Sequence, residues 1–221
     1  MKSFRQFIAK YPAQSYKKGE TILLKGDKPR GMYIVESGLV KVYTITNSGD
    51  ERLVTIARDE EEFPVGFSVG LIDRAQYFYE AFTNCRIRII PPLEFLEYSL
   101  SDREVMQRRL TRVISLLLAA HARVNALEQS RASDKIAETL FYMAWQFGTA
   151  VRAPTPRFRL NVTQQEIANS LGLTRETTNI ELKKLETNHI ISHTRKNYIL
   201  YMERLKKYLG KDDGDSGTIQ R

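Results

Sequence analysis

A polar face is predicted on the helical segment that follows Thr174. If Thr178, Leu182 and Leu185, spaced by four and three, face a protein core, the opposite side of the helix is mainly charged. Five residues lie on that side: Arg175, Glu176, Asn179, Lys183 and Lys184. Cations neutralise phosphates, and side chains of a helix can reach base edges in the major groove of DNA. We therefore expect this face to contact DNA.

Capping residues divide the surrounding stretch into two short helices joined by a tight turn. Thr163 followed by Glu166 has the pattern of a capping box, and Gly172 can take the left-handed conformation that ends a helix. Ile167 and Leu171 give the first helix an apolar face. The stretch predicts a helix-turn-helix whose second helix enters the major groove. A generic helical hairpin with a solvated polar face is the alternative.

A β-hairpin is predicted after these helices. Residues 190–192 and 198–201 are apolar and β-prone, and the turn Thr194–Asn197 between them contains two cations. Such a hairpin would be a wing with its basic tip against phosphates, and an ordinary surface hairpin is the alternative. We assign phosphate contacts to six residues: Thr163, Thr174, Lys183, Lys184, Arg195 and Lys196.

Composition supports a DNA-binding protein. The 221 residues suffice for two modest domains, and the net charge is +8. Residues 131–210 hold 13 lysines and arginines against 7 aspartates and glutamates, so the basic excess lies around the helix-turn-helix. No run of 18 apolar residues and no apolar signal core is present, so we expect a cytoplasmic protein without membrane association. The single cysteine, Cys85, excludes an internal disulfide and a cysteine-ligated iron–sulfur cluster within one chain.

A heptad pattern precedes the helix-turn-helix. Apolar residues recur at alternating spacings of four and three: Met106, Leu110, Val113, Leu117, Ala120, Val124 and Leu127. Such a seam is typical of a coiled coil, and we expect a parallel homodimer. The alternative is one helix packed on its own domain, for which Ile114 and Leu118 form a second stripe. Both can hold if one stripe docks on the β-roll while the other meets a partner helix.

Short apolar strands separated by turn residues fill the first hundred residues, which indicates a roll of β-strands. The predicted fold class is α+β, in four parts: a β-roll over residues 1–100, a dimerisation helix over 101–130, a winged helix-turn-helix domain over 131–210 and a disordered tail over 211–221. The segment Ala150–Phe158, with Pro154 and Pro156, is predicted to be a connecting loop.

In this order of elements the chain resembles the CRP/FNR family of bacterial transcription regulators, whose β-roll is a double-stranded β-helix of the cyclic-nucleotide-binding type. The resemblance covers about residues 15–208. Its most specific stretches are Tyr16–Glu20, Gly26–Asp27, Tyr33–Tyr43, Thr163–Ala168 and Leu173–Thr177. It implies a homodimeric regulator that binds a near-palindromic site on double-stranded DNA and has RNA polymerase as a further partner.

The resemblance assigns base contacts to the second helix. Arg175 and Glu176 match family positions that contact base edges, where a guanidinium suits guanine and a carboxylate suits a cytosine amine. Asn179 lies one turn further on. The family often has arginine at the position of Ile180, so we expect a different half-site; Ile180 either touches a thymine methyl group or packs.

The ligand-binding segment departs from the family pattern. Cyclic-nucleotide binders there carry a glutamate for the ribose and, about ten residues on, an arginine followed by Ser or Thr for the phosphate. This chain has Phe67 near the first position and Ala75-Gln76 at the second, with Arg74 one residue away. Because burying a phosphate without its cation is costly, we predict that the protein does not bind cyclic AMP tightly. A sensor switched by a cyclic nucleotide or another small effector is the alternative function.

Five aromatic residues surround that segment: Phe63, Phe67, Tyr77, Phe78 and Tyr79. They either line a pocket for an apolar or aromatic effector, or fill the roll as core. No arrangement of nucleophile, base and acid points to an enzyme, and the histidine spacing, with only the weak pair His189/His193, predicts no metal site. We therefore predict no cofactor.

Overall fold

The computed structural model describes residues 2–194 and 196–211. The chain divides into two compact units, residues 1–115 and 116–221, and the boundary falls inside a long helix. The predicted disordered tail, 211–221, lies outside the described residues except for Lys211.

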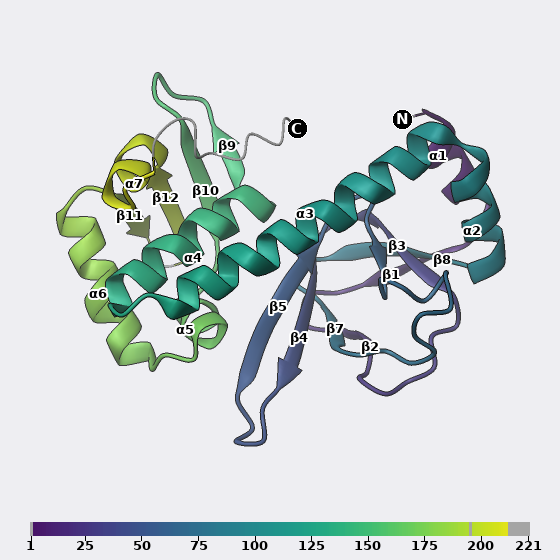
Figure 1. The fold of residues 1–221 in the computed structure, drawn as a ribbon, viewed down its shortest axis with the longest axis horizontal. Helices are drawn as coiled ribbons and strands as arrows, with labels where there is room; N and C mark the ends of the chain where they lie inside the picture. The colour runs from purple at the N-terminus through teal and green to yellow at the C-terminus, as the bar shows by residue number, and fades with distance from the viewer. Residues whose placement is uncertain (1, 195, 212–221) are drawn as a thin grey trace. The chain divides into compact units, whose positions relative to one another are not determined.

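The first unit is the predicted β-roll (Figure 1). It holds two four-stranded sheets, in the orders β1-β8-β3-β6 and β2-β7-β4-β5, and all the paired strands are antiparallel. The strands are β1 (Ala13–Tyr16), β2 (Thr21–Leu23), β3 (Met32–Ser37), β4 (Val40–Ile45), β5 (Glu51–Ala57), β6 (Glu62–Phe63), β7 (Phe78–Ala81) and β8 (Cys85–Ile90).

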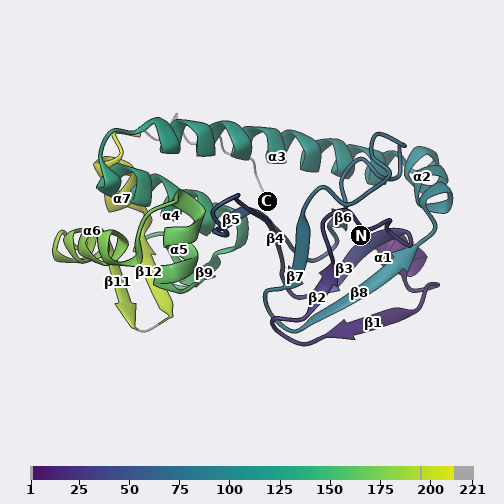
Figure 2. The same cartoon turned by 90° about the horizontal axis from the view of Figure 1, so that it is seen from below.

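Two apolar clusters hold this unit together. One lies between the sheets and includes Val35, Val40 and Ile87, all fully buried. The other joins the outer side of the roll to three helices: α1 (Lys2–Ile8), α2 (Pro92–Ser101) and the start of α3 (Arg103–Glu128). Figure 2 shows β1, β8 and β3 side by side in the first sheet.

The second unit contains the end of α3 and a helical domain with its own sheet. Its further elements are α4 (Ala132–Phe147), β9 (Thr149–Val151), β10 (Arg157–Asn161), α5 (Gln164–Leu171), α6 (Arg175–Thr187), β11 (Ile191–Thr194), β12 (Asn197–Tyr201) and α7 (Met202–Tyr208). The antiparallel sheet has the order β11-β12-β10-β9. Helix α4 buries Ile136, Leu140, Met143 and Ala144 on the predicted face.

The loop predicted over Ala150–Phe158 is shorter in the structure: residues 152–156 form the loop, and the predicted ends belong to strands β9 and β10. β9 and β10 form a hairpin that extends the wing sheet, and the two prolines, Pro154 and Pro156, lie in its loop, where no ladder hydrogen bond is needed. The alternation of Phe158 and Leu160 with Arg157 and Arg159 is the strand signal behind β10.

Candidate nucleic-acid interface

Helix α5 begins and ends where its capping residues require. The Thr163 hydroxyl accepts from the Glu166 backbone N–H at 3.1 Å, and the Glu166 carboxylate accepts from the Thr163 backbone N–H, so the predicted capping box is confirmed. Gly172 ends the helix with φ of 70°. Ile167 and Leu171 are buried, so the first helix presents its apolar side to the domain.

Helix α6 has the predicted orientation. Thr174 caps it by accepting a hydrogen bond from the Thr177 backbone N–H at 3.1 Å. Thr178, Leu182 and Leu185 are buried, which confirms the inward positions, and the Thr178 hydroxyl donates to the Thr174 carbonyl at 2.9 Å. The cap and the buried face together fix which side of α6 meets solvent.

The exposed side of α6 carries the predicted DNA contacts. Arg175, Glu176 and Lys183 are exposed, and Ile180 is half exposed, so it does not serve as core. Lys184 is exposed and pairs with Glu181 at 2.7 Å. The lysine end of this pair is 60% exposed and the glutamate end 13% exposed, so the Lys184 ammonium group faces solvent, where a phosphate could reach it.

Asn179 differs from its neighbours because it is only partly exposed. Its side-chain oxygen accepts a hydrogen bond from the Gln164 side-chain nitrogen at 3.1 Å. Gln164 is the first residue of α5, and the sequence prediction missed it. A helical repeat cannot predict a contact between residues 15 positions apart. Gln164 and Asn179 meet because they lie on two neighbouring helices, α5 and α6.

The hairpin β11–β12 has the position expected of a wing. Its strands pair from Ile191 with Leu200 to Thr194 with Asn197, and Lys196 at the tip is exposed. Arg195, assigned to a phosphate, lies outside the described residues. The hydroxyl oxygens of Thr163 and Thr174 accept the helix-capping hydrogen bonds. The Thr174 hydroxyl also donates to the Thr177 hydroxyl at 2.9 Å, so a phosphate contact by Thr174 would have to replace that hydrogen bond.

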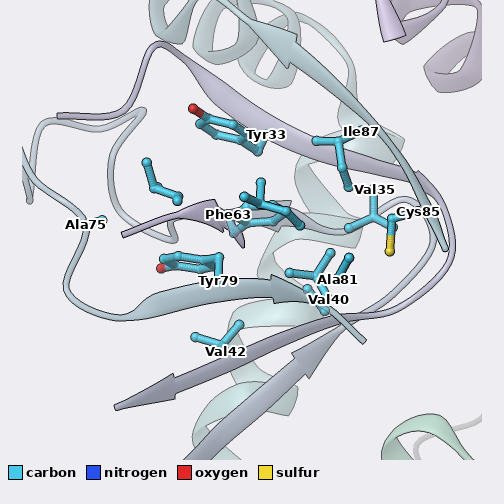
Figure 3. Close-up of a cluster of buried hydrophobic side chains, with 13 residues drawn as sticks. Tyr33, Val35, Val40, Val42, Phe63, Ala75, Tyr79, Ala81, Cys85 and Ile87 are labelled. Atoms are coloured by element: carbon cyan, nitrogen blue, oxygen red, sulfur yellow. The ribbon is translucent and has the colours of Figure 1, made fainter. Parts of the chain in front are cut away.

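The five aromatic residues of the roll do not gather in one place. Phe63 stacks between Tyr33 and Tyr79, with ring centroids 5.3 and 4.8 Å away, inside the core between the sheets (Figure 3). Phe67 packs on the other apolar cluster. Tyr77 is exposed, and Phe78 stacks on Tyr43 at 5.3 Å.

Ala75 and Gln76, the residues predicted to match the family's phosphate-binding arginine and hydroxyl residue, carry no cation. Ala75 is 2% exposed, and its backbone N–H donates to the Asp27 carbonyl at 2.9 Å. Arg74 is exposed and donates to the Gly26 carbonyl at 3.0 Å. Among the described residues, no group of three His, Cys, Asp or Glu side chains is placed to hold a metal ion.

Helix α3 leaves most of the predicted seam in solvent. Leu110 is 58% exposed and Leu117 is 55% exposed, with Val113, Val124 and Leu127 similarly open. The residues of the second stripe, Ile114 and Leu118, are 46% and 48% exposed. Met106 is partly buried and Ala120 is exposed.

Arginines, rather than leucines, attach the start of α3 to the roll. They meet three consecutive glutamates just before and within β6: Arg108 with Glu60 at 2.7 Å, Arg112 with Glu61 at 2.7 Å, and Arg109 with Glu62 at 3.2 Å. Arg109 also donates to the Ser68 hydroxyl at 3.0 Å and lies over the Phe95 ring. Burial raises the pKa of Glu61 even though Arg112 and Arg58 oppose the shift.

Comparison with known proteins identifies both units. Residues 134–208 match the Crp-like helix-turn-helix domain, and residues 13–102 match the cyclic nucleotide-binding domain. The fold and the site therefore define a DNA-binding transcription regulator with an N-terminal sensor domain. The fumarate and nitrate reduction regulatory protein of Vibrio cholerae is 30% identical over 179 residues, which span 79% of this chain and 69% of that protein. The chain belongs to the CRP/FNR family of transcription regulators.

Solved structures share the fold. A CRP/FNR-family regulator of Thermus thermophilus superposes with a TM-score of 0.70 at 22% identity, covering 90% of this chain and 99% of that one. A variant of CooA from Carboxydothermus hydrogenoformans gives a TM-score of 0.76 at 20% identity, covering 92% and 90%.

Proposed function

We propose that this protein is a homodimeric regulator that binds a near-palindromic DNA site, with each α6 in a major groove and half-sites about 34 Å apart. The observation that carries the proposal is the division of α6 into a buried face, Thr178, Leu182 and Leu185, and an exposed face that starts at Arg175. For this function we propose the domain limits expected from the sequence: roll 1–100, dimerisation helix 101–130 and DNA-binding domain 131–210.

Each residue of the interface has a proposed role. Arg175, Glu176, Asn179 and Ile180 contact base edges. Phosphate contacts fall to Thr163, Thr174, Lys183, Lys184, Arg195 and Lys196. RNA polymerase is the proposed protein partner. Regulation at a promoter requires no catalytic group, and a protein bound to chromosomal DNA works in the cytoplasm.

The exposed side of α3 supports the homodimer. Leu110, Val113 and Leu117 form a continuous apolar row that water would hydrate at a cost of roughly 25 cal/mol per Å². Helix α3 is the one described helix whose length and composition would also suit a membrane span. Its arginines 108, 109 and 112 pair with glutamates of the roll, and charges are costly in hydrocarbon, so a second α3 is the better partner.

Selection from a random DNA library tests the interface. The wild-type protein should recover a two-fold motif, and Arg175→Ala should lose about 1–3 kcal/mol and relax one position in each half-site. Arg152→Ala, which removes an exposed arginine of the same unit, is the matched control and should recover the wild-type motif. Affinity should fall steeply with salt. An unchanged motif and affinity for Arg175→Ala would refute the assignment.

We also propose that the roll does not bind cyclic AMP tightly. Aromatic rings of Phe63 and Tyr79 stack between the sheets, and Ala75 supplies no cation for a cyclic phosphate. Calorimetry with cyclic AMP and cyclic GMP should show no binding at micromolar concentrations. Tight binding of either would instead favour the effector-switched sensor.

A further inference from the structure

The contact between Gln164 and Asn179 determines which end of the Asn179 side-chain amide faces outward from α6. Gln164 lies at the first position of α5, directly after the Thr163 cap, and Asn179 lies in the second turn of α6. The Gln164 Nε2 atom donates to the Asn179 Oδ1 atom at 3.1 Å. Both side chains are partly buried, whereas Arg175, Glu176 and Ile180 around Asn179 are exposed.

The two ends of an asparagine amide have opposite chemistry. The oxygen accepts hydrogen bonds and the nitrogen donates two. An unconstrained asparagine suits adenine, because it accepts from N6 and donates to N7 at once. In this chain the oxygen is held toward α5, so the nitrogen is the end left for a ligand on the open side of α6.

We propose, on the basis of the DNA-binding function above, that Gln164 is a positioning residue that sets the base preference of Asn179. With its nitrogen outward, Asn179 favours guanine, whose O6 and N7 atoms are both acceptors in the major groove. Adenine is disfavoured at that position because its N6 amine donates toward a donor. Gln164 thereby determines specificity without touching the base.

A matched pair exists on the same helix. Gln165 donates from its Nε2 to the Asn169 Oδ1 at 2.7 Å, and both residues belong to α5. A Gln165→Glu substitution therefore puts a carboxylate into a Gln–Asn contact of the same kind that lies within α5 and not on α6, which makes it the matched control.

The test is selection from a random DNA library with five proteins: wild type, Asn179→Ala, Gln164→Ala, Gln164→Glu and Gln165→Glu. Asn179→Ala identifies the position concerned, because its preference for guanine is lost there. Gln164→Ala should reduce the guanine-over-adenine preference at that position by about tenfold. Gln164→Glu can only accept, so it should turn the Asn179 oxygen outward and favour a base that donates, adenine or cytosine. Gln165→Glu should keep the wild-type motif.

Each outcome separates this proposal from the proposed function. A wild-type protein that selects no motif contradicts DNA binding itself. A wild-type motif in which Asn179→Ala changes a position that both Gln164 variants leave unchanged overturns the positioning role and leaves DNA binding intact. Adenine in the wild-type motif at that position also overturns it. Circular dichroism spectra matching wild type confirm that the Gln164 variants are folded.

Discussion

Helices α6 and α3 distribute their side chains in opposite ways. Helix α6 buries Leu182 and Leu185 and exposes charged residues, as expected for a helix on the surface of a domain. The first half of α3 turns arginines toward the roll and leaves Leu110 and Leu117 more than half exposed. The contrast shows that a helix can be oriented toward a partner outside its own domain; we propose that this partner is DNA for α6 and a second α3 helix for α3.

Charge pairing gives a physical reason for the orientation of α3. A helix with two apolar stripes could rotate and bury its leucines on its own roll. Three arginine–glutamate pairs, with Arg109 and Arg112 largely buried, oppose that rotation because it would take one cation away from each glutamate. Glu60 and Glu61 would keep their pairs with Arg5 and Arg58. The pairs therefore favour the orientation in which the apolar row stays available.

The largest effect is expected from a charge in the apolar row of α3. Leu117→Glu places a carboxylate where two α3 helices would meet, and an unpaired buried charge is strongly unfavourable. Sedimentation equilibrium should show monomer, and the affinity for a two-fold site should fall about 100-fold or more, since the second half-site no longer adds avidity. Leu93→Glu, on α2 and 71% exposed, is the control and should remain dimeric. A Leu117→Glu protein that stays dimeric would contradict the proposal that the apolar row of α3 meets a second α3.

A smaller but still large effect is expected on the opposite side of α3. Arg112→Met removes the closer of two arginines that pair with the buried Glu61. Because Arg58 remains at 3.0 Å, the loss should be somewhat less than the cost of about 3–5 kcal/mol for breaking a buried pair completely. Urea unfolding followed by circular dichroism measures the loss, and Arg112→Met combined with Glu61→Gln should recover much of it. The control is Arg86→Met, because Arg86 is 56% exposed and its pair with Glu36 should contribute about 1 kcal/mol or less. If Arg112→Met and Arg86→Met lost equally little free energy of unfolding, the Arg112–Glu61 pair would be hydrated rather than buried.

The sequence predicted α6 better than α3 because the relevant signals have different ranges. Caps and spacings of three and four lie within a few residues, so Thr163, Thr174 and the buried face of α6 were all predictable. The partner of Arg112 is 51 positions away, and a heptad pattern cannot show which stripe meets the chain's own domain. The sequence could therefore not show whether the second stripe, Ile114 and Leu118, contacts the roll.

The same limit applies to the roll and the recognition surface. The predicted strands were largely found, but composition could not decide whether five neighbouring aromatic residues share one cavity. The alternation along β7 sends Tyr79 into the core and Phe78 to the other face, against Tyr43. Gln164 was missed for a related reason, since its partner Asn179 is on another helix.

A moderate effect is expected at the cap that orients α6. Thr174→Ala removes the acceptor for the Thr177 backbone N–H and should reduce the free energy of unfolding by about 1 kcal/mol. Thr187→Ala makes the same substitution in the last residue of α6, where the hydroxyl donates to the Lys183 carbonyl, and should cost less. Urea unfolding ranks the two variants. The reverse ranking would mean that the cap does not hold the start of the DNA-contacting helix.

The smallest effect is a difference in pH dependence between two glutamates of the roll. A hydrogen bond from Arg88 lowers the pKa of Glu36 below its usual value of 4.5. The ionised Glu36 therefore stabilises the fold above pH 4.5, and this stabilisation is lost as the pH falls through the folded-state pKa. Burial raises the pKa of Glu61 above its usual value of 4.5. The protonated Glu61 therefore contributes stability that is present below pH 4.5 and is lost as the pH rises through the folded-state pKa. Measured by urea unfolding between pH 4 and about 7, the stability of wild type relative to Glu36→Gln should rise with pH, and relative to Glu61→Gln it should fall. If the two stability differences changed equally with pH, Glu61 would be as well hydrated as Glu36. The buried ion pairs would then no longer explain why α3 turns its arginines toward the roll.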